Sequence, residues 1–521
     1  MSVSVSLLRR SVADAVAYLR TLADVREAEV FAANNANLTA RLNYSSHIPS
    51  NGLEEPKSIE SYGVGIRLAL QTDAGVRVGF GSEPSDLSLE GVRRAVEKAR
   101  RGAVLDPEFV SLPRPGTARP RRALADYHDP RIMRIHDGQL VEAGWSVVER
   151  ALEAFQSSEA LLEWARTPEG INDLGLLLTG DVVVLQERVA IGSTSFQPVL
   201  HDESTLIFSF VTSMVEAQHA KGSGWSEGSQ LADFSGEAGA EAVRNAIRAA
   251  GGQRVPDGKY RMVLGPQPVT DMLNNLVLPG LTVDLFYASA SPFQGKLDRQ
   301  VASEMLSIYD HGAVRGLAAS KGITDEGLPT GRTDLVRQGR LVGLLSNWYE
   351  TQRILRDPKG KEKLGADPSQ RRRAIEPRNG FRAGPGGGRQ FDRPPATTAT
   401  NVLLEGSREM SQEELLRLVG DGLYIGRIWY TYPINGIAAG DFTCTVVGDS
   451  YIIRDGRIVA PLKPNTVRIN DSIHNVLKGV LGVGKEKKAT TIWSADQVVH
   501  APEIAVEGLE VREIAGYMEG L

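Results

Sequence analysis

Residues that could bind a metal ion or act as a nucleophile are few and scattered. The eight histidines run from His47 to His500, and none is followed by glutamate. The single cysteine, Cys444, alternates within a strand-like pattern, which favours a buried, inert thiol over a nucleophile. Gly-x-Ser-x-Gly, P-loop and Gly-x-Gly-x-x-Gly elements do not rise above chance. The residues alone therefore predict neither a nucleophile nor a convergent set of metal ligands.

Three histidines, His128, His136 and His201, each precede an aspartate. A carboxylate beside an imidazole can orient a metal ligand, which is one interpretation of these pairs. We favour ordinary surface or turn residues, because the three pairs are scattered along the chain.

The overall composition is typical of a soluble globular protein. At 521 residues the chain is long for one core, so we expect two or three domains. A net charge of -5 gives no general attraction to nucleic acid or to an anionic membrane surface. One cysteine excludes an internal disulfide and favours a reducing compartment. Since no apolar run approaches the ~20 residues of a membrane span and no secretory pattern opens the chain, we expect a cytoplasmic protein without membrane contact.

Hydrophobic periodicity predicts an amino-terminal α+β domain over residues 1–120. Two helices enclose a set of antiparallel strands, and a proline-containing linker closes the unit. The predicted helices cover 7–22 and 89–101, and the predicted strands cover 28–32, 38–44, 61–71 and 76–80.

A central α+β domain is predicted over residues 121–255 and a strand-rich carboxy-terminal domain over 256–521. Helices at 138–157 and 237–250 belong to the central unit. In the last domain, Ser411 and Glu414 form a capping-box pattern that begins a helix. Asp455-Gly456, between two β-rich runs, predicts a hairpin. The fold class is therefore α+β, with helices inserted between mostly antiparallel strands.

The composition changes within the last domain, where residues from about 356 to 400 lack a hydrophobic period. This stretch is rich in glycine, proline and arginine, and we expect a flexible basic loop. A solvated surface loop is the favoured interpretation, and a loop that gates substrate or binds an anion or nucleic acid is the alternative. Phe381 and Phe391 are its only aromatic residues, which weakens the nucleic-acid alternative.

An ordered series of short motifs resembles the TldD/PmbA family. No single motif is specific, but their order across most of the chain is. The motifs are Gly63-Val64-Gly65-Ile66-Arg67, Gly79-Phe80, Asp325-Glu326-Gly327-Leu328-Pro329, Arg332-Thr333-Asp334-Leu335-Val336, Gly339-Arg340-Leu341, Asp421-Gly422-Leu423-Tyr424, Gly440-Asp441-Phe442, Asp455-Gly456-Arg457-Ile458 and Pro461-Leu462-Lys463.

The resemblance implies a zinc-protease scaffold without its metal site in this chain. Catalytically competent TldD-type members carry His-Glu-x-x-x-His on the helix that follows the strand matching 259–265, and a third ligand, a cysteine, near the carboxy terminus. Here the helix 268–276 contains no histidine and no correctly placed glutamate, and 483–487 contains no cysteine. The chain therefore looks like the PmbA/TldE branch, with no catalytic or metal-binding residue of its own.

The same resemblance implies a heterodimer whose zinc lies in a TldD-like partner subunit and whose substrates are small unfolded peptides. Candidate substrate-binding residues are Asp325, Glu326, Gly327, Arg332, Gly387 and Arg389. For Asp325-Glu326-Gly327, a plain turn between strands is an equal alternative.

Two other function classes remain as alternatives. One is a stand-alone peptidase with an unrecognised site, which bound zinc on the isolated chain would reveal. The other is a non-enzymatic peptide- or nucleic-acid-binding modulator, since the family has also been labelled a modulator of DNA gyrase. The net acidic charge makes a nucleic-acid partner unlikely.

Overall fold

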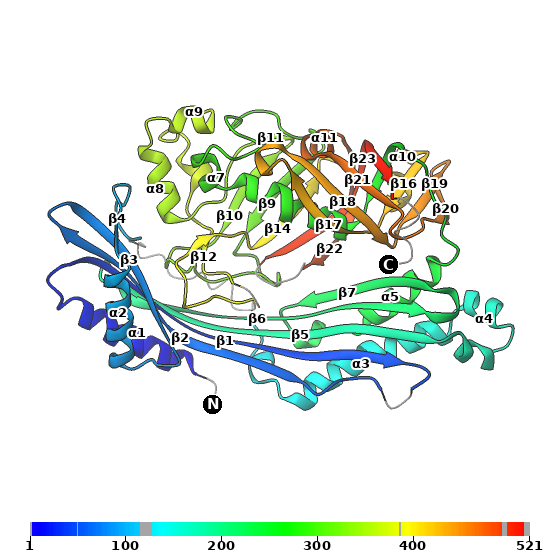
Figure 1. Ribbon diagram of the computed structural model, residues 1–521, viewed down its shortest axis with the longest axis horizontal. Helices are drawn as coiled ribbons and strands as arrows, with labels where there is room; N and C mark the ends of the chain where they lie inside the picture. The colour runs from blue at the N-terminus through cyan, green and yellow to red at the C-terminus, as the bar shows by residue number, and fades with distance from the viewer. Residues whose placement is uncertain (1–2, 49–50, 115–127, 385–386, 492–496, 515–521) are drawn as a thin grey trace.

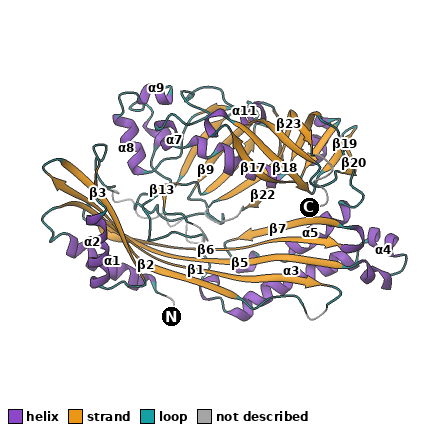
Figure 2. Ribbon diagram, viewed as in Figure 1, coloured by secondary structure: helices purple, strands orange, loops and turns teal. Residues whose placement is uncertain are grey.

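A computed structural model of the protein describes residues 3–48, 51–114, 128–384, 387–491 and 497–514. A long curved sheet forms the lower layer in Figure 1, with a carboxy-terminal domain above it and helices beneath it. Figure 2 shows that strands dominate both layers, and the α+β class with a strand-rich carboxy-terminal domain is confirmed. No helix among the described residues is long and apolar enough to cross a membrane.

The lower layer is an antiparallel sheet in which the described residues form seven strands, ordered β4-β3-β2-β1-β5-β6-β7. Its strands are β1 (Val25–Ser45), β2 (Lys57–Thr72), β3 (Gly75–Pro84), β4 (Val104–Leu105), β5 (Leu176–Ser193), β6 (Phe196–Val215) and β7 (Ala220–Gly228). β1 pairs with β5 from Glu29–Ser193 to Ser45–Leu177. The predicted boundary at residue 120 lies outside the described residues, and strands from both sides of it share this one sheet.

Four helices and a shorter one accompany this sheet: α1 (Val5–Leu19), α2 (Leu89–Arg101), α3 (Asp137–Gln156), α4 (Glu159–Ala165) and α5 (Glu237–Arg248). Short 3₁₀ turns join them at Ile132–Arg134, Glu169–Leu174, Glu216–Gln218 and Leu231–Asp233. α1 and α2 pack on β1 and β2 in one apolar cluster, and α3 and α5 pack on β5 and β6 in a second. Two cores under one sheet explain why the sequence pattern resembles two separate domains.

The carboxy-terminal domain contains a mixed sheet of fourteen strands in the part of the chain that is described. They are β8 (Gly258–Leu264), β9 (Leu306–His311), β10 (Arg332–Arg337), β11 (Arg340–Leu341), β14 (Asn401–Gly406), β15 (Glu409–Met410), β16 (Gly422–Ile425), β17 (Arg427–Ile434), β18 (Asp441–Gly448), β19 (Tyr451–Arg454), β20 (Arg457–Pro461), β21 (Val467–Ser472), β22 (Val480–Thr490) and β23 (Val498–Glu513). β8 lies between β16, which is parallel to it, and β23, which is antiparallel.

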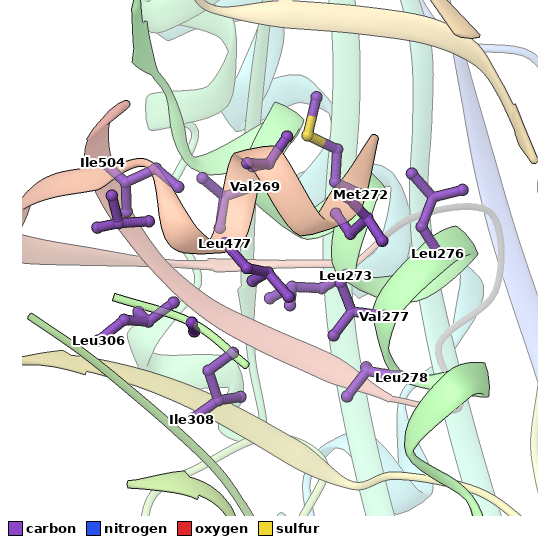
Figure 3. Packing of buried hydrophobic residues seen from close by; sticks show 14 of the residues in the cluster. Val269, Met272, Leu273, Leu276, Val277, Leu278, Leu306, Ile308, Leu477 and Ile504 are labelled. Carbon is purple, nitrogen blue, oxygen red and sulfur yellow. The ribbon is translucent and has the colours of Figure 1, made fainter. Parts of the chain in front are cut away.

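Short helices cover this second sheet: α6 (Pro266–Met272), α7 (Val283–Tyr287), α8 (Trp348–Arg356), α9 (Gly360–Leu364), α10 (Gln412–Val419) and α11 (Ile473–Lys478). A π-helical turn, Leu273–Val277, continues α6, and 3₁₀ turns lie at Pro279–Leu281, Arg372–Ile375 and Ile437–Ala439. Figure 3 shows Val269, Met272 and Leu276 of the α6 region among the apolar core. Burial of this apolar face holds α6 against the sheet.

Two local predictions in this domain are confirmed. Ser411 Oγ accepts a hydrogen bond from the Glu414 backbone N–H at 3.3 Å, and the Glu414 carboxylate accepts one from the Ser411 backbone N–H at 2.7 Å. β19 and β20 form the predicted hairpin, with positive φ at Asp455 and Gly456. Cys444 lies buried in β18, and burial raises the pKa of its thiol, as expected for an inert side chain.

The stretch predicted to be a flexible basic loop contains packed structure. Besides α9 and a 3₁₀ turn, it forms a small pair of strands, β12 (Gly380–Phe381) and β13 (Ala396–Thr397). Arg382 and Arg389 are buried within it. The expectation of a solvated loop is therefore wrong for this part of the stretch, because its arginines have buried carboxylate partners that lie far away in the sequence.

We expect Gly222→Ala to destabilise the fold by about 1–3 kcal/mol, because α5 crosses β7 closely at this point. A Cβ atom on Gly222 would lie 2.1 Å from the backbone nitrogen of Ala246. Gly448→Ala in β18 is the matched control, since no atom lies within 4 Å of its Cβ position. Urea unfolding of the two variants measures the difference, and equal stabilities would refute the close approach.

Candidate functional site

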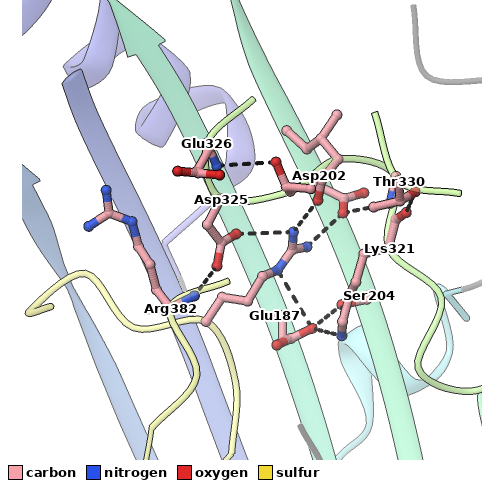
Figure 4. Close-up of polar contacts among 12 residues, drawn as sticks. Glu187, Asp202, Ser204, Lys321, Asp325, Glu326, Thr330 and Arg382 are labelled. Carbon is pink, nitrogen blue, oxygen red and sulfur yellow. Dashed lines mark hydrogen bonds and ion pairs between the residues drawn. The ribbon is translucent and has the colours of Figure 1, made fainter. Parts of the chain in front are cut away.

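Five of the six predicted site residues lie where the carboxy-terminal domain meets the lower sheet. The turn that holds Asp325, Glu326 and Gly327 lies beside the strands that carry Glu187 and Asp202 (Figure 4). Arg389, on another segment, contacts Asp325, Asp202 and Glu187. The Asp325 and Glu326 side chains are fully buried. The site is thus an interface inside the chain, built from segments far apart in the sequence.

Arg389 is the centre of this site. Its Nη2 lies 2.7 Å from Asp202 Oδ2, its Nη1 lies 3.5 Å from Asp325 Oδ1, and its Nε lies 3.9 Å from Glu187 Oε2. Nη1 also donates to the backbone oxygen of Ile323 at 3.2 Å. Burial alone would lower the pKa of Arg389, but the three carboxylates outweigh burial and raise it. The guanidinium therefore stays charged and holds β5, β6 and the 323–325 turn together.

Lys321 supplies a second cation to the same cluster. It pairs with Glu187, and its Nζ lies 3.0 Å from Ser204 Oγ. Burial alone would raise the pKa of Glu187, but Lys321 and Arg389 outweigh burial and lower it to about 2. Asp202 also accepts from the Gly322 backbone N–H at 2.9 Å. Each buried charge thus faces an opposite charge, as buried ions require.

A neighbouring cluster surrounds Arg382, which is fully buried. Its guanidinium pairs with Glu29 of β1 and lies 4.6 Å from the centre of the Phe31 ring. Arg67 of β2 binds the other oxygen of Glu29 at 2.9 Å. The Arg382 backbone N–H donates to Asp325 Oδ2 at 2.6 Å, which links the two clusters.

Two buried carboxyl groups of the turn, those of Asp325 and Glu326, are only partly compensated by nearby positive charge. Burial raises the pKa of Asp325 to about 6 even though Arg389 is close, because three carboxylates share that guanidinium. Burial also raises the pKa of Glu326 to about 7, with Arg67 opposing the shift and Glu29 adding to it. Glu326 Oε2 accepts from the Trp348 backbone N–H at 2.9 Å, and its Oε1 has no hydrogen-bond partner among the described residues. Glu326 is therefore poised to titrate near neutral pH.

Three predicted residues, Gly327, Arg332 and Gly387, lie outside the two charged clusters. Gly327 has φ +75° and closes a turn through its N–H to the Thr324 oxygen at 3.0 Å, so the predicted turn is present. Arg332 lies apart on β10, over the Tyr309 ring at 3.6 Å and 2.8 Å from Asp334. Gly387 lines a cavity of about 260 Å³ above the central strands of the lower sheet.

This cavity has polar walls. Asn35 donates to the backbone oxygen of Arg389 at 2.7 Å, and its own side-chain oxygen has no hydrogen-bond partner in the described part of the chain. The described residues that line the cavity are Asn35, Ala36, Asn37, Ile59, Ser61, Leu185, Gln186, Glu187, Gly387, Gly388 and Gln390. Amide side chains and the backbone of glycine are groups that can hydrogen-bond to peptide amides.

The chain is similar to known proteins in its sequence and in its fold. Residues 257–513 match the family model of the PmbA/TldA metallopeptidase C-terminal domain. The chain belongs to the TldD/PmbA family. Among curated relatives, the metalloprotease TldD homolog of Buchnera aphidicola subsp. Schizaphis graminum is 25% identical over 48% of this chain and 45% of its own length. A metalloprotease of Methanothermobacter thermautotrophicus is 26% identical over 48% of each chain.

Solved structures of TldD/PmbA-like fold cover nearly the whole chain. TldE from Thermococcus kodakarensis superposes with a TM-score of 0.74 at 16% identity, over 96% of this chain and 100% of that chain. A proposed modulator of a DNA gyrase from Thermotoga maritima gives a TM-score of 0.73 at 19% identity, over 96% and 99%. The curated sequence relatives are matched over only about half of their length.

The TldD/PmbA helix that would carry a zinc motif does not fit a zinc ion in this chain. Gln267 of α6 bonds to both backbone groups of Ile428, and Asp271 bonds to Thr431 and to Asn275. Burial raises the pKa of Asp271 to about 6. Among the residues with described coordinates, no group of three or more histidine, cysteine or acidic side chains could hold a metal ion.

Several residues of the ionic site escaped sequence analysis, namely Glu29, Glu187, Asp202, Lys321 and Arg382. A usable signal was present: charged residues interrupt the otherwise apolar strands β1, β5 and β6. Of the His-Asp pairs, His136 is the N-cap of α3, an ordinary structural role. His201 is exposed on β6, whereas the next residue, Asp202, is the buried partner of Arg389.

Replacing Arg389 by methionine should destabilise the chain by about 3–5 kcal/mol, because it leaves buried carboxylates without a counter-ion. Arg371→Met is a matched control in the same basic stretch, since Arg371 forms an exposed pair with Asp298 at 2.7 Å. That control should cost about 0–1 kcal/mol. Thermal or urea unfolding gives both values, and a similar loss in the two variants would contradict the central role of Arg389.

The stability of the protein should depend on pH through Glu326. Its folded-state pKa of about 7 lies above the ordinary value of 4.5, so its contribution is fully present below pH 4.5 and is lost as pH rises through 7. Relative to Glu326→Gln, the wild type should lose about 3 kcal/mol of unfolding free energy between these limits. Urea unfolding at pH 5 and pH 8 measures this, and parallel pH profiles would rule it out.

Proposed function

We propose that this chain is the PmbA/TldE-like, non-metal subunit of a zinc metalloprotease that cleaves or trims small unfolded peptides. In this proposal the zinc belongs to a TldD-like partner subunit, with which the chain forms a heterodimer. Curated relatives that match about half of the chain are metalloproteases, which supports the peptide-hydrolase class.

The proposal rests on one observation, namely that contacts within the chain occupy the side chains of α6. Gln267 and Asp271 of this helix are buried and bound to β17 and to their own helix, and its third polar side chain, Thr270, is buried as well. Its other side chains, including Val269 and Met272, pack in the apolar core. A helix used in this way has no room for an open zinc coordination position, which a catalytic zinc requires.

The chain would contribute a wall of the peptide cavity. The ionic site fixes Arg382 and Arg389 over the sheet, and Gly387 and Gly388 line the 260 Å³ cavity. Asp325, Glu326 and Arg389 would act by positioning, since their side chains are buried. Gly387 would contact substrate directly. Arg332 lies outside the residues that line this cavity and would contact only a more extended peptide.

Reconstitution tests the proposal. The purified chain mixed with a zinc-bearing TldD-like chain from the same organism should hydrolyse a small unfolded peptide that neither chain cleaves alone. Elemental analysis should find zinc at one ion per two chains in the complex. One zinc per isolated chain together with activity would instead establish a stand-alone peptidase. Unchanged activity of the partner on mixing would refute the subunit role.

A variant that fills the cavity tests whether the substrate contacts this wall. In the reconstituted pair, Ser61→Phe should lower peptide turnover, because Ser61 lines the cavity. Ser58→Phe is the matched control on the same strand: Ser58 is exposed and, three residues away, points to the opposite face of the sheet. We expect at least about a tenfold loss for Ser61→Phe alone, equivalent to 1.4 kcal/mol of transition-state binding. Equal turnover in both variants would remove this cavity from the substrate path.

A further inference from the structure

A second cavity, of about 340 Å³, lies where α5 and β7 of the lower layer meet the carboxy-terminal domain (Figure 1). It is separate from the ionic site, and no residue lines both cavities. The lining residues that matter are Trp225, Arg248, Tyr424, Asp449, Tyr451 and Glu503. The two domains therefore enclose a polar space to which each contributes a wall.

The carboxy-terminal wall carries an incompletely bonded carboxyl group. Asp449 is 7% exposed, and its Oδ1 accepts only a long hydrogen bond of 3.4 Å from the Ser223 backbone N–H. Its second oxygen accepts no hydrogen bond from any described residue, and Arg427 is near without forming an ion pair. Burial raises the pKa of Asp449 to about 7, and Arg427 offsets this only in part. Asp449 thus forms no direct ion pair with a described residue, although the charges of Arg427 and Lys488 act on it from a distance.

Glu503 on β23 adds a second carboxyl group to the same wall. Its Oε1 accepts hydrogen bonds from Tyr424 at 2.8 Å and from Gln412 at 2.6 Å, whereas its Oε2 accepts none from the described residues. Burial raises the pKa of this side chain as well. Asp449 and Glu503 thus both line the cavity, and neither forms an ion pair with a described residue.

The opposite wall is cationic. Arg244 and Arg248 lie one turn apart on α5. Arg244 pairs with Glu237, but Arg248 forms no salt bridge within the described parts of the chain. No ion pair joins either arginine to Asp449 or Glu503 across the gap. Between the walls, Lys488 bonds to Glu241 at 2.5 Å and lies 3.6 Å from the centre of the Trp225 ring, which completes the floor.

We propose that this cavity binds a small zwitterion with a free ammonium and a free carboxylate group, namely a free amino acid or a dipeptide. The ammonium group would lie between Asp449 and Glu503, and the carboxylate group would face Arg248. The ring of Trp225 gives an apolar surface for the side chain. Opposite charges on facing walls select a ligand that carries both charges at its two ends. The volume is near the lower limit of small-molecule sites, about 300 Å³, which excludes long peptides.

Binding of a zwitterion rests on this geometry alone, whereas the source of the ligand rests on the proposed function. Complete hydrolysis of a peptide bond adds water and releases a new carboxylate and a new ammonium group. Amino acids and dipeptides are therefore the products that a peptidase generates beside this site. Because the two domains supply opposite walls, an occupied cavity would also hold the domains together.

Calorimetric titration of the isolated full-length chain tests the site. The probes are dialanine, N-acetyl-dialanine, dialanine amide and alanine. Dialanine should bind, and blocking either end should weaken binding at least about tenfold. Tighter binding of alanine than of dialanine would assign the site to free amino acids, and the reverse would assign it to dipeptides. Absence of binding by both, or equal binding of the blocked analogues, would overturn the proposal.

Two variants test the acidic wall and the cationic wall of the cavity separately. Asp449→Asn should retain the fold, because asparagine tolerates the φ of +49° found there, and should lose dialanine affinity at least about tenfold. Arg248→Gln should weaken dialanine but leave the residual binding of dialanine amide unchanged. Arg101→Gln, an exposed arginine at the end of α2, is the control and should change neither. Unaltered dialanine binding in Asp449→Asn and Arg248→Gln would place the ligand elsewhere.

The two proposals fail independently. If the reconstituted pair hydrolyses peptides while the isolated chain binds no dialanine, the zwitterion site is wrong and the subunit role stands. If dialanine binds with the expected dependence on both of its ends while no partner restores activity, the site stands and its assignment to cleavage products is wrong.

Discussion

The guanidinium group of Arg389 holds the carboxy-terminal domain against the lower sheet. Arg389 reaches from the carboxy-terminal domain to Asp202 on β6, and it shares Asp325 with the Arg382 backbone. Burying these charges is unfavourable unless each meets its counterpart, so the arrangement forms completely or not at all. This contact fixes Arg389 beside the 323–327 turn and the strands β5 and β6.

Helix α6 and the ionic site use their polar side chains in different ways. A catalytic zinc site needs polar, partly open donors on a helix, whereas this helix uses its side chains to fill the core and to bond β17. Arg389, Lys321 and Glu187 form a buried ionic cluster at the domain boundary instead.

Sequence patterns predicted the local elements well and the long-range pairing poorly. Capping chemistry located the α10 start at Ser411, and Asp455-Gly456 located a hairpin, because both signals act within a few residues. The pairing of β1 with β5 has no local signal, so two units were expected where one sheet exists. For the same reason the buried partners of Arg389 could not be deduced: a basic stretch looks solvated until its distant carboxylates are known.

The long pairing of β1 with β5 has a consequence for synthesis of the chain. β1, β2 and β3 leave the ribosome first, and the edge of β1 that β5 will cover stays open until residues beyond Leu176 have emerged. That edge presents unpaired backbone groups on a strand of twenty-one residues with an apolar core face, which is a template for association with other chains. The nascent amino-terminal part of the chain is thus open to association with other chains until β5 has emerged.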